Sequence, residues 1–231
     1  MSVSQRVTQN QYFIYLRKGK EETDMELLEE ILNQNNLNKA YKKVVANKGV
    51  AGVDGITVEE EFDYLKENKD RILNQIRKRK YKPQPVKRVQ IPKENGKMRN
   101  LGIPTVTDRI IQQAIFQVIS PIFEKQFNDN SFGFRPNRSC EQAVVRALEY
   151  LNDGYEWIVD IDLEKFFDTV NQDKLITIIG KTITDGDVVS LIRKYLSAGV
   201  MEKGIVKATT VGTPQGGNLS PLLSNIMLNE L

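Results

Sequence analysis

The sequence predicts an α+β fold, and three observations support this prediction. Helical patterns, several of them opened by capping residues, recur along most of the 231-residue chain. Alternating apolar residues lie on both sides of Asn95-Gly96, a dipeptide that favours a two-residue β-turn, so residues 86–104 should form a β-hairpin. The segment WIVDIDL at 157–163 has the period-two alternation of a strand. We therefore expect helices joined to a partial antiparallel sheet.

The first 80 residues are expected to contain three helices and one glycine-rich loop. The first and third of these helices should each begin at a capping box, in which a hydroxyl and a carboxylate satisfy free backbone amides. The two capping boxes are Thr23-x-x-Glu26 and Thr57-x-x-Glu60. Between them a helix is expected at about 38–48, and the loop GVAGVDG follows at 49–55.

After the hairpin the pattern predicts mainly helices. They are expected at about 105–127, 139–154, 172–180 and 187–197, and from Ser220 onwards. The second of these has a capping box, Ser139-x-x-Gln142, at its start and Gly154 at its end. A further hairpin is expected around Lys203-Gly204.

Composition excludes several classes of protein. No apolar run approaches the roughly 18 residues of a membrane span, and the N-terminus lacks the pattern of a secretory signal, so we expect no membrane partner. The single cysteine, Cys140, excludes an internal disulfide and favours a reducing, bacterial-type cytoplasm. The absence of histidine from the sequence excludes Ser–His and Cys–His hydrolases. Any chemistry must therefore use carboxylates, basic groups and bound metal ions.

Positive charge is concentrated in residues 77–99, which contain ten lysines or arginines and one acidic residue, Glu94. Such a cluster can neutralise phosphates and would make nucleic-acid binding dependent on salt. The alternative is a solvated helix end that continues into a loop. Charge placement alone does not decide between these two interpretations.

Two carboxylates share one face of the expected strand at 157–163. Alternation places Asp160 and Asp162 on the face opposite Trp157 and the other apolar residues. Mg²⁺ prefers oxygen ligands and completes its shell with water and substrate phosphates, so these acids can begin a metal site. The alternative is that acids at the end of a strand cap the helix that follows.

Four segments resemble, in the same order, motifs of group II intron-type reverse transcriptases. They are IPKENGKMRNLGIPTVTDRIIQQAI, SFGFRPNRSCEQAV, DIDLEKFFD and TPQGGNLSPLLSNIMLNEL. The resemblance covers roughly residues 24–231 and implies the fingers-palm fold of a reverse transcriptase. It implies a helical, RNA-binding N-terminal extension at 1–56, fingers at 57–153 and a partial palm at 154–231.

The resemblance also implies roles for individual residues. Asp162 is the implied catalytic carboxylate, metal binding is assigned to Asp162 and Leu163, and Asp160 is the lesser candidate. Phe167, five residues after Asp162, corresponds to the aromatic residue that packs against the incoming sugar. Asp168 is expected to hold the following turn through backbone amides.

Two larger groups are implied as ligand contacts. The nucleotide-binding group is Lys93, Arg99, Phe167, Gln215 and Gly216. The RNA-binding group is Arg77, Lys78, Arg79, Lys80, Lys82, Lys87, Arg88, Arg135 and Arg138. For Arg135 and Arg138 the alternative is that they only fix their own loop.

The implied activity is that of an RNA-directed DNA polymerase that uses Mg²⁺ and binds intron or template RNA, primer DNA and an incoming dNTP. The family's second carboxylate pair lies in a Tyr-x-Asp-Asp hairpin, and this sequence contains no Asp-Asp pair. Only part of a two-metal site is therefore expected, and the chain itself is expected to be inactive. The alternative function is a non-catalytic, RNA-binding maturase scaffold that assists intron splicing. An unprotected edge of a partial palm sheet also predicts a possible homodimer.

Overall fold

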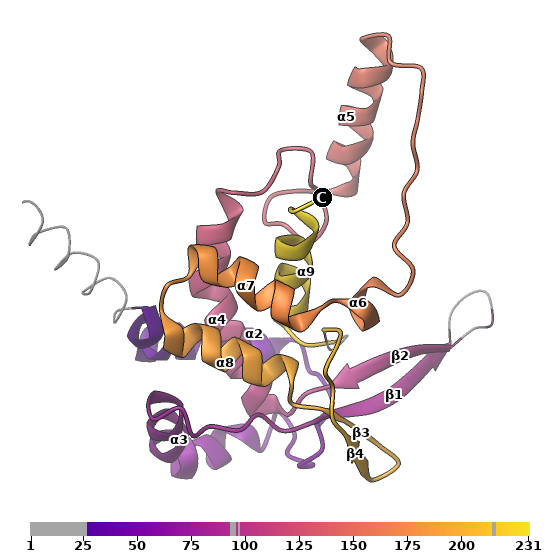
Figure 1. Cartoon of the computed structure of the whole chain (residues 1–231). Helices are drawn as coiled ribbons and strands as arrows, with labels where there is room; N and C mark the ends of the chain where they lie inside the picture. Colours follow the sequence, from indigo (N-terminus) through magenta and orange to yellow (C-terminus); the bar gives the residue numbers. More distant parts are fainter. Residues whose placement is uncertain (1–26, 93–95, 97, 214–215) are drawn as a thin grey trace, which may run out of the picture.

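The computed structural model describes residues 27–92, 96, 98–213 and 216–231. Figure 1 shows a helical body with a sheet at one side and one helix, α5, that rises away from both. The helices are α2 (Gln34–Ala46), α3 (Glu61–Arg77), α4 (Val106–Glu124), α5 (Cys140–Asn152), α6 (Phe166–Thr169), α7 (Gln172–Thr182), α8 (Gly186–Leu196) and α9 (Ser220–Leu228). Within the described ranges, no helix is long and apolar enough to cross a membrane.

The ends of several helices agree with the capping residues in the sequence. Thr57 and Glu60 form the expected reciprocal capping box, with hydrogen bonds of 3.0 and 3.3 Å. Ser139 and Gln142 do the same at the start of α5. The capping box expected at residues 23–26 lies outside the described residues, although residues 27–32 are helical.

Helix α4 is the centre of the hydrophobic core. It packs against α2, α3 and α9, and its buried side chains are spread over most of its circumference. A second layer forms where α7 packs against α8 and α9. The buried residues of these helices belong to one continuous hydrophobic cluster, so the body of the molecule has a single core.

A buried polar cluster fixes the start of α4 to the segment that leads into the sheet. Asp108 accepts hydrogen bonds from the Tyr81 hydroxyl at 2.6 Å, the Thr105 hydroxyl at 2.8 Å and the Gln84 backbone N–H at 3.0 Å. Burial raises the pKa of Asp108, and it raises the pKa of Tyr81 well above its usual value. The cluster therefore anchors the base of the hairpin that follows.

The sheet has four strands in the order β2-β1-β3-β4. The predicted hairpin is formed by β1 (Val86–Pro92) and β2 (Met98–Ile103), which are antiparallel, with Arg88 opposite Gly102. The second predicted hairpin is formed by β3 (Val200–Glu202) and β4 (Ile205–Lys207). Strand β3 runs parallel to β1, with Val200 beside Val86. The sheet is therefore mixed, whereas the sequence predicted an antiparallel one.

The prediction of a strand at 157–163 was wrong. These residues form an extended segment without strand pairing, and their side chains are exposed, with Trp157 at 94%. A strand exists only when a neighbouring strand accepts its backbone hydrogen bonds. Among the described residues no strand lies beside this segment, so its alternation has no sheet to join.

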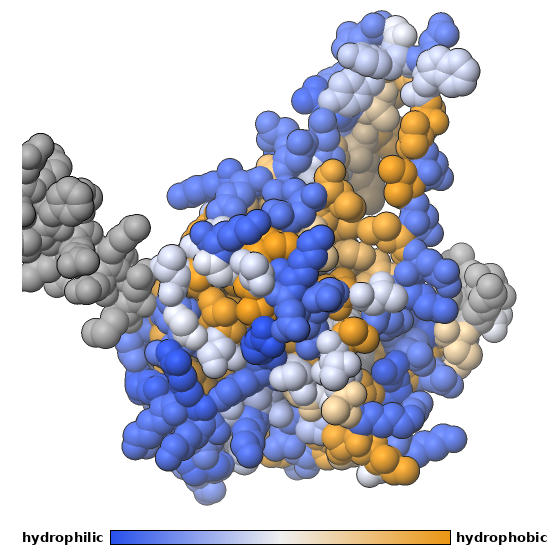
Figure 2. Space-filling model, in the orientation of Figure 1, coloured by the Kyte–Doolittle hydropathy of each residue, from blue (hydrophilic) through white to orange (hydrophobic). Residues whose placement is uncertain are grey.

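Helix α5 and the segment 155–163 together project from the body of the molecule, and we call them the arm. Although α5 is amphipathic, none of its residues is buried. Figure 2 shows apolar side chains along the arm, and the exposed large hydrophobic residues there are Val144, Val145, Leu148, Tyr150, Leu151, Tyr155, Trp157, Ile158, Val159, Ile161 and Leu163. None of these side chains belongs to the hydrophobic core cluster.

Candidate nucleic-acid and nucleotide site

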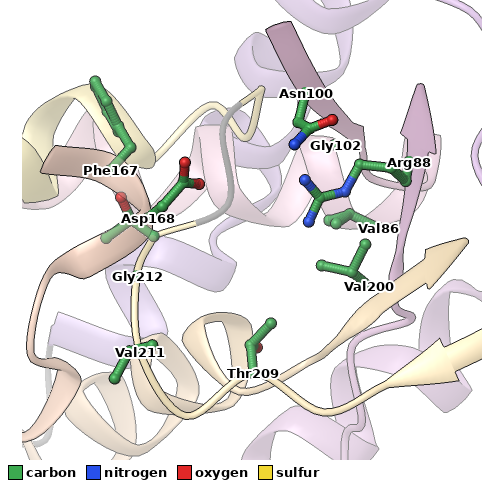
Figure 3. A pocket seen from close by; sticks show the side chains of 11 residues that line it. Val86, Arg88, Asn100, Gly102, Phe167, Asp168, Val200, Thr209, Val211 and Gly212 are labelled. Atoms are coloured by element: carbon green, nitrogen blue, oxygen red, sulfur yellow. The ribbon is translucent and has the colours of Figure 1, made fainter. Parts of the chain in front are cut away.

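A polar cavity of about 260 Å³ lies where three distant segments meet. The base of the β1–β2 hairpin forms one wall, the turn that contains α6 forms another, and residues 209–213 with β3 close the rest (Figure 3). The lining residues are Val86, Arg88, Asn100, Gly102, Phe167, Asp168, Val200, Thr209, Val211, Gly212 and Thr213. We call this cavity the hairpin-base pocket.

Backbone hydrogen bonds fix the two walls that face the hairpin. The Thr213 N–H donates to the Phe167 carbonyl and the Gly212 N–H donates to the Val170 carbonyl, both at 2.7 Å. Gly212 has φ +84°, and a Cβ there would lie 2.8 Å from the Phe167 carbonyl oxygen. Only glycine adopts this positive φ without strain and has no Cβ to clash with the carbonyl. The turn with Phe167 and Asp168 is therefore held firmly against residues 212–213.

Opposite charges face each other across the pocket. Arg88 extends into it from β1, and the Asp168 carboxylate enters from the α6 side (Figure 3). No ion pair joins these two groups in the part of the chain that the structure describes. Arg88 also contributes, after Lys207, to lowering the pKa of Glu202, but the described residues give neither Arg88 nor Asp168 an ion-pair partner.

Two neutral polar groups also line the pocket. The side-chain amide oxygen of Asn100 accepts a hydrogen bond from the side-chain amide of Gln90 at 3.3 Å. The described residues provide no acceptor for the Asn100 NH₂ group, which can therefore donate to a ligand. Thr213 is only 3% exposed, and its hydroxyl oxygen has no hydrogen-bond partner among the described residues. A buried hydroxyl without a partner costs about 1–3 kcal/mol, so a ligand or a water molecule that bonds to it is favoured.

The residues predicted to contact nucleotide are only partly brought together. Phe167 belongs to the pocket wall, but in Figure 3 its ring is directed away from Arg88. Arg99 is exposed, and strand alternation puts it on the face of β2 opposite Asn100. Gly216 abuts β2, because a Cβ there would lie 2.3 Å from the Gly102 carbonyl oxygen. Lys93 and Gln215 lie outside the described residues.

The predicted metal ligands lie on the arm and are not among the residues that line the hairpin-base pocket. Asp162 and Asp160 are exposed, and Leu163 can offer only its backbone carbonyl oxygen. Among the described residues no three side chains of the His, Cys, Asp or Glu type are grouped as a metal site. Two carboxylates can supply part of an Mg²⁺ shell. They do not provide the set of ligands that two ions need, and the residues present therefore do not fit a two-metal centre.

The expectation that Asp168 holds the turn is not supported. Its carboxylate lines the hairpin-base pocket, and the described residues give it no backbone amide to bond. The turn is held instead by the backbone hydrogen bonds of Gly212 and Thr213.

The basic stretch is divided between several surfaces. Arg77 forms a two-point ion pair with Glu29, and Arg79 pairs with Asp187. Lys80 and Lys82 line an open groove together with Lys194. Lys78 and Lys87 are exposed as well. Among the described residues of the stretch, these four lysines are therefore the cations best placed to meet a phosphate backbone, while Arg88 faces the pocket.

Arg135 and Arg138 have different environments. Arg135 is buried, pairs with Glu124 at 2.7 Å and donates to the carbonyls of Asn128 and Ser131 at 2.6 and 2.8 Å. Its guanidinium therefore fixes the loop, which was one of the two roles expected for it. Arg138 is partly exposed; its guanidinium donates to the backbone carbonyl and the carboxylate of Asp129 and lies over the Phe132 ring. Contact with RNA stays a prediction for Arg138.

The sequence did not identify the pocket itself. Asn100 and Thr213 were missed, and Arg88 was assigned only to a general basic surface. The register of the hairpin places Gly102 opposite Arg88 and Asn100 opposite Gln90, so strand alternation could have put Arg88 and Asn100 on one face. No local signal shows that residues 167–168 and 212–213 meet this face.

Comparisons with known proteins agree with the motifs. A family model described as reverse transcriptase (RNA-dependent DNA polymerase) matches residues 91–231. Protein YkfC of Escherichia coli K12 is 38% identical over 200 residues, which are 84% of this chain and 52% of that protein. The group II intron-encoded protein LtrA of Lactococcus lactis is 37% identical over 232 residues, covering 100% of this chain and 38% of LtrA. The chain thus spans about half or less of the length of these relatives.

Structural comparison supports the same fold. A chain of a solved structure described as a partial Cas6-RT-Cas1–Cas2 complex superposes with a TM-score of 0.61 and 23% sequence identity. The match covers 88% of this chain and 34% of that chain. At this level of identity the match shows a shared fold and nothing about partners.

Proposed function

Because the chain belongs to the reverse transcriptase (RNA-dependent DNA polymerase) family, we propose that it provides the fingers and part of the palm of a group II intron-type RNA-directed DNA polymerase. We place the fingers at residues 57–153 and the partial palm at 154–231, preceded by an RNA-binding extension. The likeness to LtrA supports the intron type.

The observation that carries this proposal is the meeting of three motif segments at one pocket. The hairpin, the DIDLEKFFD segment and the start of TPQGGNLSPL are far apart in sequence, yet each contributes residues to the wall of the hairpin-base pocket or abuts it. A chain that only displayed basic charge to RNA would not need these segments to converge. The convergence fits a site that handles nucleic acid and nucleotide together.

Intron or template RNA, primer DNA and dNTP are the proposed ligands, and Mg²⁺ is the proposed cofactor. The exposed lysines of the basic stretch supply contacts to phosphates. Asp162, with the backbone carbonyl of Leu163, would supply part of an Mg²⁺ shell. Since the residues present do not complete a two-metal site, we propose that the 231-residue chain by itself does not extend a primer.

RNA binding by the exposed lysines tests this proposal. Reversing charge at Lys78, Lys80 and Lys82 to glutamate should weaken binding of a single-stranded RNA by at least ~10-fold at 0.1 M salt. It should also reduce the slope of log affinity against log salt by about 2, or about 0.7 per lost phosphate contact. Fluorescence anisotropy measures both quantities.

The matched control reverses three exposed lysines elsewhere, Lys39, Lys125 and Lys174. We expect it to change RNA affinity less than about threefold, because screening at this salt limits the effect of distant charges. Equal losses in the two triple variants would contradict a defined RNA surface. Template-dependent incorporation of dNTP by the unaltered chain would contradict the proposed inactivity.

A maturase scaffold that only binds intron RNA is the second candidate. Nuclear intron maturase 1 of Arabidopsis thaliana is 30% identical to this chain over 104 residues, and this similarity favours the second candidate. In a longer protein that contains this chain, Asp162→Asn separates the two functions. Loss of DNA synthesis with RNA binding retained supports the polymerase, and unchanged DNA synthesis contradicts a catalytic role for Asp162.

A further inference from the structure

We propose that the hairpin-base pocket binds one ribonucleotide unit of an RNA strand, with Arg88 at the phosphate and Asp168 at the ribose 2′-hydroxyl. The inference rests on the proposed function, because it specifies which nucleic acid the same site prefers. It assigns to the pocket a selectivity for RNA over DNA.

The charges in the pocket exclude simple ligands. A small anion would be attracted by Arg88 and repelled by Asp168, and a metal ion would meet the reverse situation. A suitable ligand has an anionic group at one end and a hydrogen-bond donor at the other. A nucleotide of RNA has both, since its phosphate matches a guanidinium and its 2′-hydroxyl can donate to a carboxylate.

The neutral groups of the pocket support the same ligand. The Asn100 NH₂ group can donate to a phosphate or sugar oxygen, and the described part of the chain offers the buried Thr213 hydroxyl no hydrogen-bond partner. A sugar-phosphate unit offers both acceptors and a donor to these groups. The volume of about 260 Å³ is slightly below the usual range for drug-sized ligands, ~300–1,000 Å³, and suits one such unit.

The position of Arg88 favours a strand over a free nucleotide. Arg88 belongs to the basic stretch, and the exposed Lys87 is its neighbour on β1. A strand whose backbone follows these cations would bring successive phosphates past the pocket. The Phe167 ring is directed away from Arg88, so packing of an incoming sugar on that ring would not compete with a ribose beside Asp168.

The test compares binding of RNA and DNA oligonucleotides of one sequence to the 231-residue chain. The unaltered chain should bind RNA at least ~10-fold more tightly than DNA, the effect of one hydrogen bond to a charged group. Asp168→Ala should bring this ratio close to one, and Asp168→Asn, which keeps an acceptor oxygen, should restore part of it. A 2′-deoxy substitution along the RNA should have the same effect as Asp168→Ala, and the two effects should not add.

Three controls separate the possible outcomes. Glu164→Gln removes an exposed carboxylate that does not line the pocket and should leave the RNA-to-DNA ratio unchanged. Arg88→Ala should weaken RNA and DNA binding alike and lower the salt slope by about 0.7. Thr213→Val should weaken RNA binding without changing the salt slope.

An RNA-to-DNA ratio that survives Asp168→Ala would overturn the inference, even if RNA binding itself is intact. If neither the RNA nor the DNA oligonucleotide binds, the proposed function is contradicted as well. Cytidine 5′-monophosphate tests whether the pocket takes a ribonucleotide within a strand or a free nucleotide. If this free nucleotide binds as tightly as the oligonucleotide and competes with it, the assignment to a strand is wrong.

Discussion

Glu61 is a carboxylate with no exposed surface, at the start of α3. One of its oxygens accepts a hydrogen bond from the Thr107 hydroxyl at 2.7 Å, and no described residue donates a hydrogen bond to the other. Burial is the main cause that raises the pKa of Glu61 from 4.5 to about 7, and the charges of Asp54 and Asp108 act in the same direction. The hydrogen bond from Thr107 and the charge of Arg109 oppose the shift.

This raised pKa predicts that the chain loses stability as pH rises from about 4.5 to about 7. The folded state holds the Glu61 proton more tightly than the unfolded state, so the contribution of this group is complete below pH 4.5 and disappears through pH 7. The difference in pKa corresponds to about 3 kcal/mol of unfolding free energy. Urea denaturation at several pH values measures the change.

Glu61→Gln should remove most of this dependence, because glutamine remains neutral throughout. Glu67→Gln, an exposed carboxylate on the same helix, is the matched control and should leave the pH profile unchanged. The buried Asp108, whose pKa is also raised, remains in both variants and so cancels from their comparison. Identical pH profiles for Glu61→Gln and the unaltered chain would contradict this account.

At the scale of elements, the arm differs from the rest of the molecule. Its apolar side chains are exposed, and the backbone of residues 156–162 forms no hydrogen bond with another described residue. Exposed apolar alternation next to unpaired backbone is a template for pairing with another strand. We therefore propose that the arm mediates self-association of the 231-residue chain, in the form of a homodimer.

Replacing Trp157 and Ile161 with serine should abolish this self-association. Both side chains are more than three-quarters exposed, so the double variant should change the unfolding free energy of the chain by less than about 0.5 kcal/mol. Sedimentation equilibrium measures the association, and denaturation measures the stability. An unaltered chain that remains monomeric at high concentration would contradict the proposal.

The helices and strands differ in how well local sequence signals predict them. The hairpin β1–β2 was predicted because a turn dipeptide and flanking alternation are local signals. The strand at 157–163 was predicted from equally clear alternation, but pairing is a property of two segments and the described residues supply no second one. The same reason applies to the site, since no local pattern brings Asp168 and Thr213 to the face of β1 that carries Arg88.

At the scale of the whole molecule, α4 links the helical body to the candidate site. The cluster around Asp108 ties the first turn of α4 to the segment before β1, and Asn218 donates to Gln113 of the same helix at 3.1 Å. Gly52 packs so closely that a Cβ would lie 2.6 Å from the Thr105 backbone. The glycine-rich loop, the hairpin and the start of α9 are therefore all positioned by one buried helix.

The central claim is that the hairpin, the turn with Phe167 and Asp168, and residues 209–213 form one surface for RNA. Photocrosslinking of an RNA oligonucleotide that contains 4-thiouridine, followed by mass spectrometry of the peptides, tests it most directly. We predict crosslinks to peptides from all three segments, and we expect excess unlabelled RNA to suppress them together. Crosslinks confined to other surfaces, such as α7 or the arm, would contradict the claim.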